Sequence, residues 1–295
     1  MQHTARVSHL AQAIHPTAFF AVLIWSGIAP FTKYALADFP TLGFMTFRMA
    51  IAGLAIFAYL ALRRRPMGIE RSDVPRFLLA GMLIFGVSSL LFTGGLARTT
   101  VAHMIIIAST GPLIAAVWRW LAYRDRPDRR SLIAMTIGFV GVLIVVGDAS
   151  SAQGASVIGD LMGVVSAALW VGMTIYPQPL VKKYGAMRST GWFIVASLLV
   201  IVPISIPSLG ALARDVPPPV AWGALLYAAM GTLVGNVLWQ SAVQQIGPAR
   251  TLIYLYMQPF LALLIAAIVL GDRLTPLQAI GGLLAIGGVM LVRKR

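Results

Sequence analysis

Ten polar or aromatic side chains with useful chemistry lie inside long apolar stretches of the sequence. These candidates are Trp25, Arg48, Ser88, His103, Trp170, Asn236, Trp239, Gln240, Tyr254 and Gln258. Indole rings offer apolar faces and attract an ammonium group through cation–π interaction. Amide and hydroxyl groups form hydrogen bonds with a carboxylate without adding a charge. Together, these residue types predict a binding surface for a small amphipathic molecule.

The spacing of four of these residues places them in two pairs on shared helix faces. Asn236 precedes Gln240 by four residues, and Tyr254 precedes Gln258 by four, so each pair lies on one side of a helix. The amide pair suits either contacts between helices or a substrate site. The second pair lies beside Pro259, which leaves a backbone carbonyl free, and makes the strongest local argument for binding.

Arg48 lies about eight residues into an apolar stretch that contains no acidic residue. An arginine at that depth in a membrane costs several kcal/mol unless it is paired or faces water. Three partners are possible: a carbonyl at a helix end, an acid near the outer side such as Asp38, or the substrate.

His103 and Ser88 are weaker candidates. The imidazole of His103 titrates near neutral pH and suits proton coupling, although its place near the start of a stretch also suits a membrane interface. Ser88 lies beside Ser89 and near Gly94 and Gly95. Small residues of this kind usually serve close helix packing.

The acidic residues and the lack of cysteine restrict the possible chemistry. All nine Asp and Glu residues lie in predicted loops or at the ends of apolar stretches, and there is no cysteine. An enzyme site needs acid–base pairs or metal ligands that converge. Carriers driven by H⁺ or Na⁺ commonly keep a carboxylate at depth. We predict no enzyme, cofactor or metal site, and expect movement down the substrate's own gradient or weak coupling through His103.

The stretches that carry these residues are predicted to be membrane-spanning helices. The 295 residues are 59% hydrophobic and 11% charged, against about 25% charged in soluble domains. Runs of about 20 apolar residues cross a bilayer as helices, and these runs lack the alternation of barrel strands. We predict an all-α integral membrane protein with ten transmembrane helices, at 17–36, 41–62, 76–96, 99–121, 131–147, 157–178, 190–208, 219–244, 250–270 and 276–292.

The net charge of +14 follows a membrane topology. With the N-terminus inside, Arg98, Arg214 and Arg273 lie outside, three basic residues lie within spans, and the other 17 of the 23 lie inside. Positive charge gathers on the cytoplasmic side of membrane proteins. We predict a multi-pass protein of a bacterial-type inner membrane with both termini in the cytoplasm and no nucleic-acid partner.

An internal repeat sets the predicted architecture. A shift of 147 residues aligns Pro112 with Pro259, Asp125-Arg126 with Asp272-Arg273, and Gly141-Val142 with Gly288-Val289. Each copy, 1–151 and 152–295, holds five spans. Because five is odd, the copies are predicted to be inverted, which is typical of carriers that alternate access around a central site. The predicted kinks or hinges are Pro30, Pro112, Pro177 and Pro259.

These features in their order resemble a known family. A Leu-Ile-Trp-like opening in each half, Arg48, the two Pro-bearing helices, the Asp-Arg turns and the closing Gly-Val pairs resemble the drug/metabolite transporter superfamily. Within it they look like the ten-helix, EamA-type exporters, and the aromatic set is similar to that of YddG-type amino-acid exporters. The resemblance implies cytoplasmic termini and a central cavity between the halves.

The residues and the resemblance predict an exporter of small amphipathic metabolites that works by alternating access. Aromatic rings and amides suit an aromatic or other neutral amino acid, whereas a phosphorylated sugar would need buried Lys or Arg. The alternative is a multidrug exporter for flat organic cations, which would need the rings but not the amides. The expected partners are a small-molecule substrate and the lipid bilayer. The oligomeric state stays open, and a monomer is compatible with the sequence.

Overall fold

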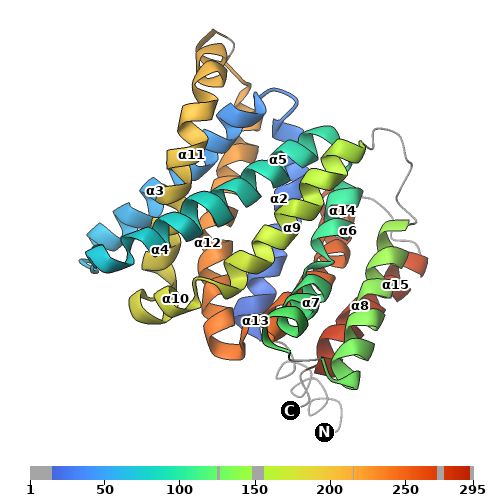
Figure 1. Ribbon diagram of the computed structural model, residues 1–295. Helices are drawn as coiled ribbons and strands as arrows, with labels where there is room; N and C mark the ends of the chain where they lie inside the picture. The colour runs from blue at the N-terminus through green and yellow to red at the C-terminus, as the bar shows by residue number, and fades with distance from the viewer. Residues whose placement is uncertain (1–14, 125–126, 148–155, 215, 271–275, 293–295) are drawn as a thin grey trace, which may run out of the picture.

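The computed structural model describes residues 15–124, 127–147, 156–214, 216–270 and 276–292, and the regular elements in these ranges are all helical (Figure 1). The first half holds α2 (Pro16–Ala35), α3 (Thr41–Leu62), η1 (Arg71–Asp73), α4 (Val74–Leu78), η2 (Leu79–Gly86), α5 (Val87–Arg98), α6 (Val101–Ala108), α7 (Gly111–Tyr123) and α8 (Arg129–Gly147). The second half holds α9 (Val157–Ile175), α10 (Gln178–Tyr184), α11 (Ala186–Arg214), α12 (Pro219–Ile246), α13 (Pro248–Ile253), η3 (Tyr254–Met257), α14 (Gln258–Leu270) and α15 (Pro276–Val292). Each predicted span corresponds to one helix or to one series of consecutive helices.

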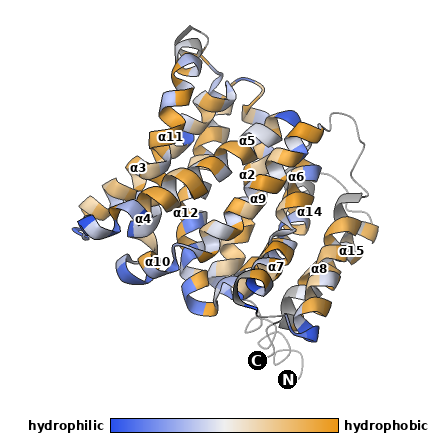
Figure 2. Cartoon of the chain, in the orientation of Figure 1, coloured by the Kyte–Doolittle hydropathy of each residue, from blue (hydrophilic) through white to orange (hydrophobic). Residues whose placement is uncertain are grey.

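The surface of the bundle suits a bilayer. Within the described ranges, seven helical stretches are long and apolar enough to cross a membrane, and Ala279–Gly288 is a shorter apolar stretch. Large apolar side chains such as Leu54, Ile206 and Leu283 are more than half exposed, which soluble proteins avoid over wide areas. Figure 2 shows hydrophobic residues along the helices and hydrophilic ones at α10 and at the adjoining end of α4. The protein is therefore a multi-pass membrane protein.

The crossing of α8 with α15 shows that the two halves are inverted copies. A Cβ atom on Gly141 would lie 2.6 Å from the Gly281 carbonyl oxygen and 2.6 Å from the Ala285 amide nitrogen. A Cβ atom on Gly288 would lie 2.7 Å from the carbonyl oxygen of Ala134 and 2.8 Å from the amide nitrogen of Gly138. These contacts exchange under the 147-residue shift, so the same contact is made twice.

The helices α8 and α15 run in opposite directions. Arg130 at the start of α8 donates a hydrogen bond from Nε to the carbonyl oxygen of Leu291 at the end of α15, over 2.8 Å. The equivalent helices therefore run antiparallel. This confirms the predicted all-α fold of two inverted five-helix repeats.

The other helices pack in the pattern that such an inversion requires. The equivalent helices α3 and α11 pack together, and Thr46 near the start of α3 lies 2.6 Å, Oγ1 to Oγ, from Ser205 near the end of α11. The first helix of each half packs against the third span of the other half: α2 on α12, and α9 on α5. These exchanged contacts bring both halves to one central region.

Three of the four predicted hinge prolines lie at helix boundaries. Pro112 opens α7 and Pro177 precedes α10, while Pro259 is the second residue of α14, and Pro30 lies inside α2. A proline ring clashes with the carbonyl four residues earlier. For Pro112 that residue is Ala108, where α6 ends, and for Pro259 it is Leu255, inside the 3₁₀ turn η3.

Several predicted features lie outside the described residues. The predicted boundary near residue 152 falls within 148–155, and the two Asp-Arg turns fall within 125–126 and 271–275.

Candidate substrate cavity

A cavity of about 140 Å³ lies between the two halves. Its size is comparable with an engineered cavity of about 150 Å³ that holds one benzene molecule. The helices that line it come from both repeats. The lining residues are Trp25, Ile28, Ala29, Arg48, Met49, Phe85, Ser88, Ser89, Phe92, Met104, Ala108, Gly163, Ser166, Ala167, Trp170, Thr232, Asn236, Leu255 and Gln258.

Three tryptophans form a cluster at one end of the cavity. The Trp25 ring centroid lies 5.2 Å from that of Trp170, at an interplanar angle of 80°, and 5.1 Å from that of Trp239. Trp25 also donates a hydrogen bond from Nε1 to the Gly231 carbonyl oxygen over 3.3 Å. Trp25 and Trp170 line the cavity, whereas Trp239 is fully buried behind them and donates to Thr174 Oγ1 over 3.2 Å.

The polar lining comes from hydroxyl and amide groups that are only partly used within the protein. Ser88 Oγ donates to the Ser166 carbonyl oxygen over 3.0 Å, and Ser166 Oγ donates to the Ser88 carbonyl oxygen over 2.8 Å. This reciprocal pair joins α5 to α9. Asn236 Nδ2 donates to the Thr232 carbonyl oxygen over 2.6 Å, and Gln258 Nε2 lies 3.5 Å from the Trp25 carbonyl oxygen.

Arg48 lines the cavity with no counter-charge. Its side chain is 4% exposed, its Nε has no hydrogen-bond partner, and none of its nitrogens is paired with another described residue. Its guanidinium carbon lies 5.9 Å from the centroid of the Phe44 ring. Asp38, one of the partners considered from the sequence, is exposed and makes no ion pair with Arg48, and no described carbonyl accepts from it. Neither of the two protein partners considered from the sequence therefore pairs with Arg48 among the described residues.

Four of the predicted site residues lie away from the lining. Trp239 supports the other two tryptophans, and Gln240 accepts a hydrogen bond at Oε1 from Gln178 Nε2 over 2.9 Å. Tyr254 accepts one at its hydroxyl from the backbone nitrogen of His15 over 2.7 Å. His103 Nδ1 lies 3.0 Å from Asp160 Oδ2, and both residues lie near the N-terminal ends of their helices, α6 and α9.

Several lining residues were not predicted as site residues. Ser166 precedes Trp170 by four residues, and Phe85 and Phe92 flank Ser88 and Ser89 at helical spacing. Helical periodicity around the predicted residues would have indicated all three. Sequence reasoning gave them no weight because small hydroxyl and apolar side chains usually serve packing.

Each half of the chain separately matches the same family of known sequences. Residues 13–147 and residues 157–294 each match the EamA-like transporter family. The chain belongs to this family. The two matched ranges correspond to the two copies found from the 147-residue shift.

Individual relatives of this EamA-like transporter are distant but cover most of its length. An uncharacterized transporter of Archaeoglobus fulgidus is 22% identical over 95% of this chain and 97% of its own. A probable terminal-alkyne amino-acid exporter of Streptantibioticus cattleyicolor is 22% identical over 93% of this chain and 91% of its own. One crystal structure covers 96% of both chains with a TM-score of 0.75 at 17% identity, which shows the shared fold.

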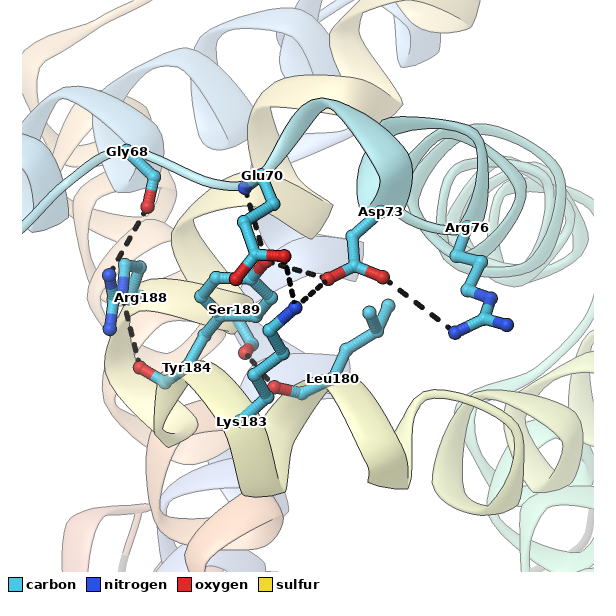
Figure 3. A network of polar contacts seen from close by, with 9 residues as sticks. All are labelled: Gly68, Glu70, Asp73, Arg76, Leu180, Lys183, Tyr184, Arg188 and Ser189. Atoms are coloured by element: carbon cyan, nitrogen blue, oxygen red, sulfur yellow. Dashed lines mark hydrogen bonds and ion pairs between the residues drawn. The ribbon is translucent and has the colours of Figure 1, made fainter.

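A polar network joins the two halves of the transporter at the face where α2 begins and α12 ends, here called the N-terminal face. In Figure 3, Lys183 of α10 reaches toward Glu70 and Asp73, at Nζ–oxygen distances of 2.7 and 2.8 Å. The Tyr184 hydroxyl donates to Asp73 over 2.6 Å, and Arg188 donates to the Gly68 carbonyl oxygen over 3.2 Å. We call these six residues the Lys183 network: Gly68, Glu70, Asp73, Lys183, Tyr184 and Arg188.

Gln178 extends the closure of this face toward the cavity. It donates from Nε2 to Gln240 Oε1 and to the Thr174 carbonyl oxygen, and it accepts from Gln244. Together with Trp239, these side chains lie between the cavity and the N-terminal face.

Proposed function

We propose that this EamA-like transporter exports small amphipathic metabolites, above all aromatic and other neutral amino acids, by alternating access through the cavity. The supporting observation is the composition of the lining: indole and phenyl rings beside hydroxyl and amide groups, with no acidic residue among the described lining residues. Rings bind the apolar part of such a molecule and attract its ammonium group. The amides and hydroxyls form hydrogen bonds with its polar end.

The placement of charge supports an orientation with the N-terminal face in the cytoplasm of a bacterial-type cell. Arg63, Arg65, Lys182 and Arg250 lie at helix ends on that face. Positive charge gathers on the cytoplasmic side of membrane proteins. Both termini then lie in the cytoplasm.

The lack of an acid in the described lining supports transport down the substrate's own gradient. Carriers coupled to ions commonly keep a carboxylate at the site. The pair of His103 and Asp160 lies outside the lining and offers the alternative route for weak proton coupling. A His103→Gln variant keeps a hydrogen-bond donor for Asp160 and removes the titratable group.

One relative supports an amino acid as the substrate, because it is named a probable terminal-alkyne amino-acid exporter. Its identity of 22% supports the class of substrate and not a particular molecule.

Counterflow in proteoliposomes with a panel of labelled amino acids tests this function. We expect uptake of aromatic amino acids without a pH gradient, and an equal rate for His103→Gln. Trp170→Ala and Asn236→Ala should each lower affinity about tenfold, since one contact of about 1.4 kcal/mol changes an equilibrium constant tenfold.

Three results would contradict parts of the proposal. Loss of uptake without a pH gradient would exclude transport by gradient alone. Failure of every amino acid would exclude the substrate class. Intact amino-acid counterflow in Asn236→Ala, with loss of organic-cation uptake in Trp170→Ala, would favour the multidrug exporter.

A further inference from the structure

We propose that Arg48 is the anion subsite of the cavity, so that substrates are recognised by a carboxylate and their ammonium group is dispensable. This inference rests on the proposed function because it names the substrate class of the same site. It predicts that apolar monocarboxylates without an amino group bind as well as amino acids do.

Arg48 is buried, and part of its hydrogen-bonding capacity is unused. The side chain is 4% exposed, and its Nε has no partner. A buried polar group without a partner is costly, and a buried charge costs far more. A residue that only stabilised the fold would be paired, so the free pairing capacity of Arg48 points to a ligand.

The charges around the cavity are not balanced. Asp160 is engaged by Thr99 and His103, and Asp73 by Lys183 and Tyr184. No described acidic residue lines the cavity. The lining therefore carries a net positive charge, which attracts a carboxylate and repels a cation that lacks one.

The geometry of a guanidinium group matches that of a carboxylate. A guanidinium group binds a carboxylate through two parallel hydrogen bonds, which gives direction as well as strength. The guanidinium carbon lies 5.9 Å from the centroid of the Phe44 ring, whose face attracts the cation from one side. Phe85, Phe92 and Trp170 line the same cavity and can bind the apolar part of the same molecule.

The ammonium group of an amino acid has no comparable partner. The described lining offers it only ring faces and neutral oxygens, since no carboxylate is present. An aromatic or aliphatic monocarboxylate therefore keeps the main contacts after the amino group is removed, and an amine of the same shape loses them.

Three ligands that share one phenyl group separate these cases: phenylalanine, 3-phenylpropionate and phenethylamine. The full-length protein is purified, and each ligand competes against counterflow of labelled phenylalanine while its effect on Tm is measured. We expect phenylalanine and 3-phenylpropionate to inhibit within about threefold of each other and to raise Tm. Phenethylamine should be at least about tenfold weaker, as expected for the loss of one charge-assisted contact.

Arg48→Met and Arg48→Lys are the test variants, and Arg98→Met is the matched control. Arg98 donates from Nη1 to the Gly94 carbonyl oxygen outside the cavity lining. Arg48→Met should lose the Tm increase caused by 3-phenylpropionate, and its ligand-free Tm should be equal to or above the wild-type value, because an unpaired buried charge is removed. Arg48→Lys keeps a charge without the two-pronged geometry and should weaken carboxylates while keeping the order of ligands. Arg98→Met should behave as wild type.

The failure of this inference differs from the failure of the proposed function. If phenylalanine is transported but phenethylamine inhibits equally, or if Arg48→Met keeps the carboxylate preference, the Arg48 subsite is wrong and the exporter stands. If Arg48→Met unfolds, Arg48→Lys decides whether the subsite is right, because this variant should bind carboxylates more weakly while keeping the wild-type order of the three ligands. If no amino acid is transported, the proposed function fails, and the Tm measurements still decide the subsite, since binding does not require transport. If no carboxylate changes the Tm of the wild-type protein, the Arg48 subsite is wrong.

Discussion

Gly235 of α12 leaves room for the Trp25 indole because it has no side chain. A Cβ atom there would overlap the indole nitrogen, which donates to Gly231 one turn away. We expect Gly235→Ala to push Trp25 from its place against Trp170 and to raise the KM of transport by roughly tenfold, since small displacements in a site have large effects. Initial uptake rates measure this. Gly223→Ala on the same helix, where no atom lies within 4 Å of the new Cβ, is the control and should leave KM unchanged.

The residues that could be predicted are those whose chemistry is out of place in an apolar stretch. Trp25, Arg48 and Asn236 were predicted for this reason, and each lines the cavity. Trp239 and Gln240 satisfied the same criterion but face the N-terminal side, because a sequence pattern gives a helix face and not the neighbour that covers it. The free state of Arg48 could not be predicted, since it depends on where Asp38 and the helix ends lie in space.

The crossing of α8 and α15 makes a prediction for a whole element. We expect Gly141→Ala and Gly288→Ala to lower the unfolding free energy by similar amounts, about 1–3 kcal/mol, because each new Cβ would lie 2.6–2.8 Å from backbone atoms that cannot move aside. Thermal unfolding of the purified protein measures the loss. Gly287→Ala meets no atom within 4 Å and serves as the control. Equal stability of all three variants would contradict the close contact.

Helix positions followed well from the sequence, and their interruptions followed in part. The apolar stretches gave the spans, and Pro112 and Pro259 gave the places where the fourth span of each half breaks. The π-helical segment η2, from Leu79 to Gly86, has no sequence signal of this kind. It lies where Gly81 and Gly86 pack closely on Phe193 and Ser197 of α11, and a local sequence pattern does not predict such tertiary contacts.

The Lys183 network concerns the whole molecule, because it joins the halves at a face where they would have to separate under the proposed alternating access. We expect Lys183→Met to expose the cavity to that face. The natural sequence has no cysteine, so Ser88→Cys gives a single thiol in the cavity. An impermeant thiol reagent added at the N-terminal face should label it several-fold faster in Lys183→Met than in its parent. Lys182→Met is the control, since the exposed Lys182 pairs with no described residue.

The pH dependence of this network follows from Lys183. Its hydrogen bonds to Asp73 and Glu70 raise the pKa of the ammonium group above the ordinary value of 10.5. A lysine whose pKa is higher in the folded state than in the unfolded state stabilises the fold fully at any pH below the unfolded-state pKa. This stabilisation is lost only as the pH rises through the folded-state pKa. Lys183 therefore stays charged between about pH 6 and 9, and the ratio of labelling rates between Lys183→Met and its parent should stay constant over that range. A change in this ratio within that range would show that a group other than Lys183 controls access from the N-terminal face.

The paired contacts of Gly141 and Gly288 have one more consequence. A contact that exchanges under the internal shift is self-complementary, of the kind found in symmetric homodimers. The atoms of that crossing come from α8 in one half and α15 in the other, so two separate polypeptides, each with one half, would carry both sides of it. A gene cut at that link should still yield a working carrier when both fragments are produced in the same cell.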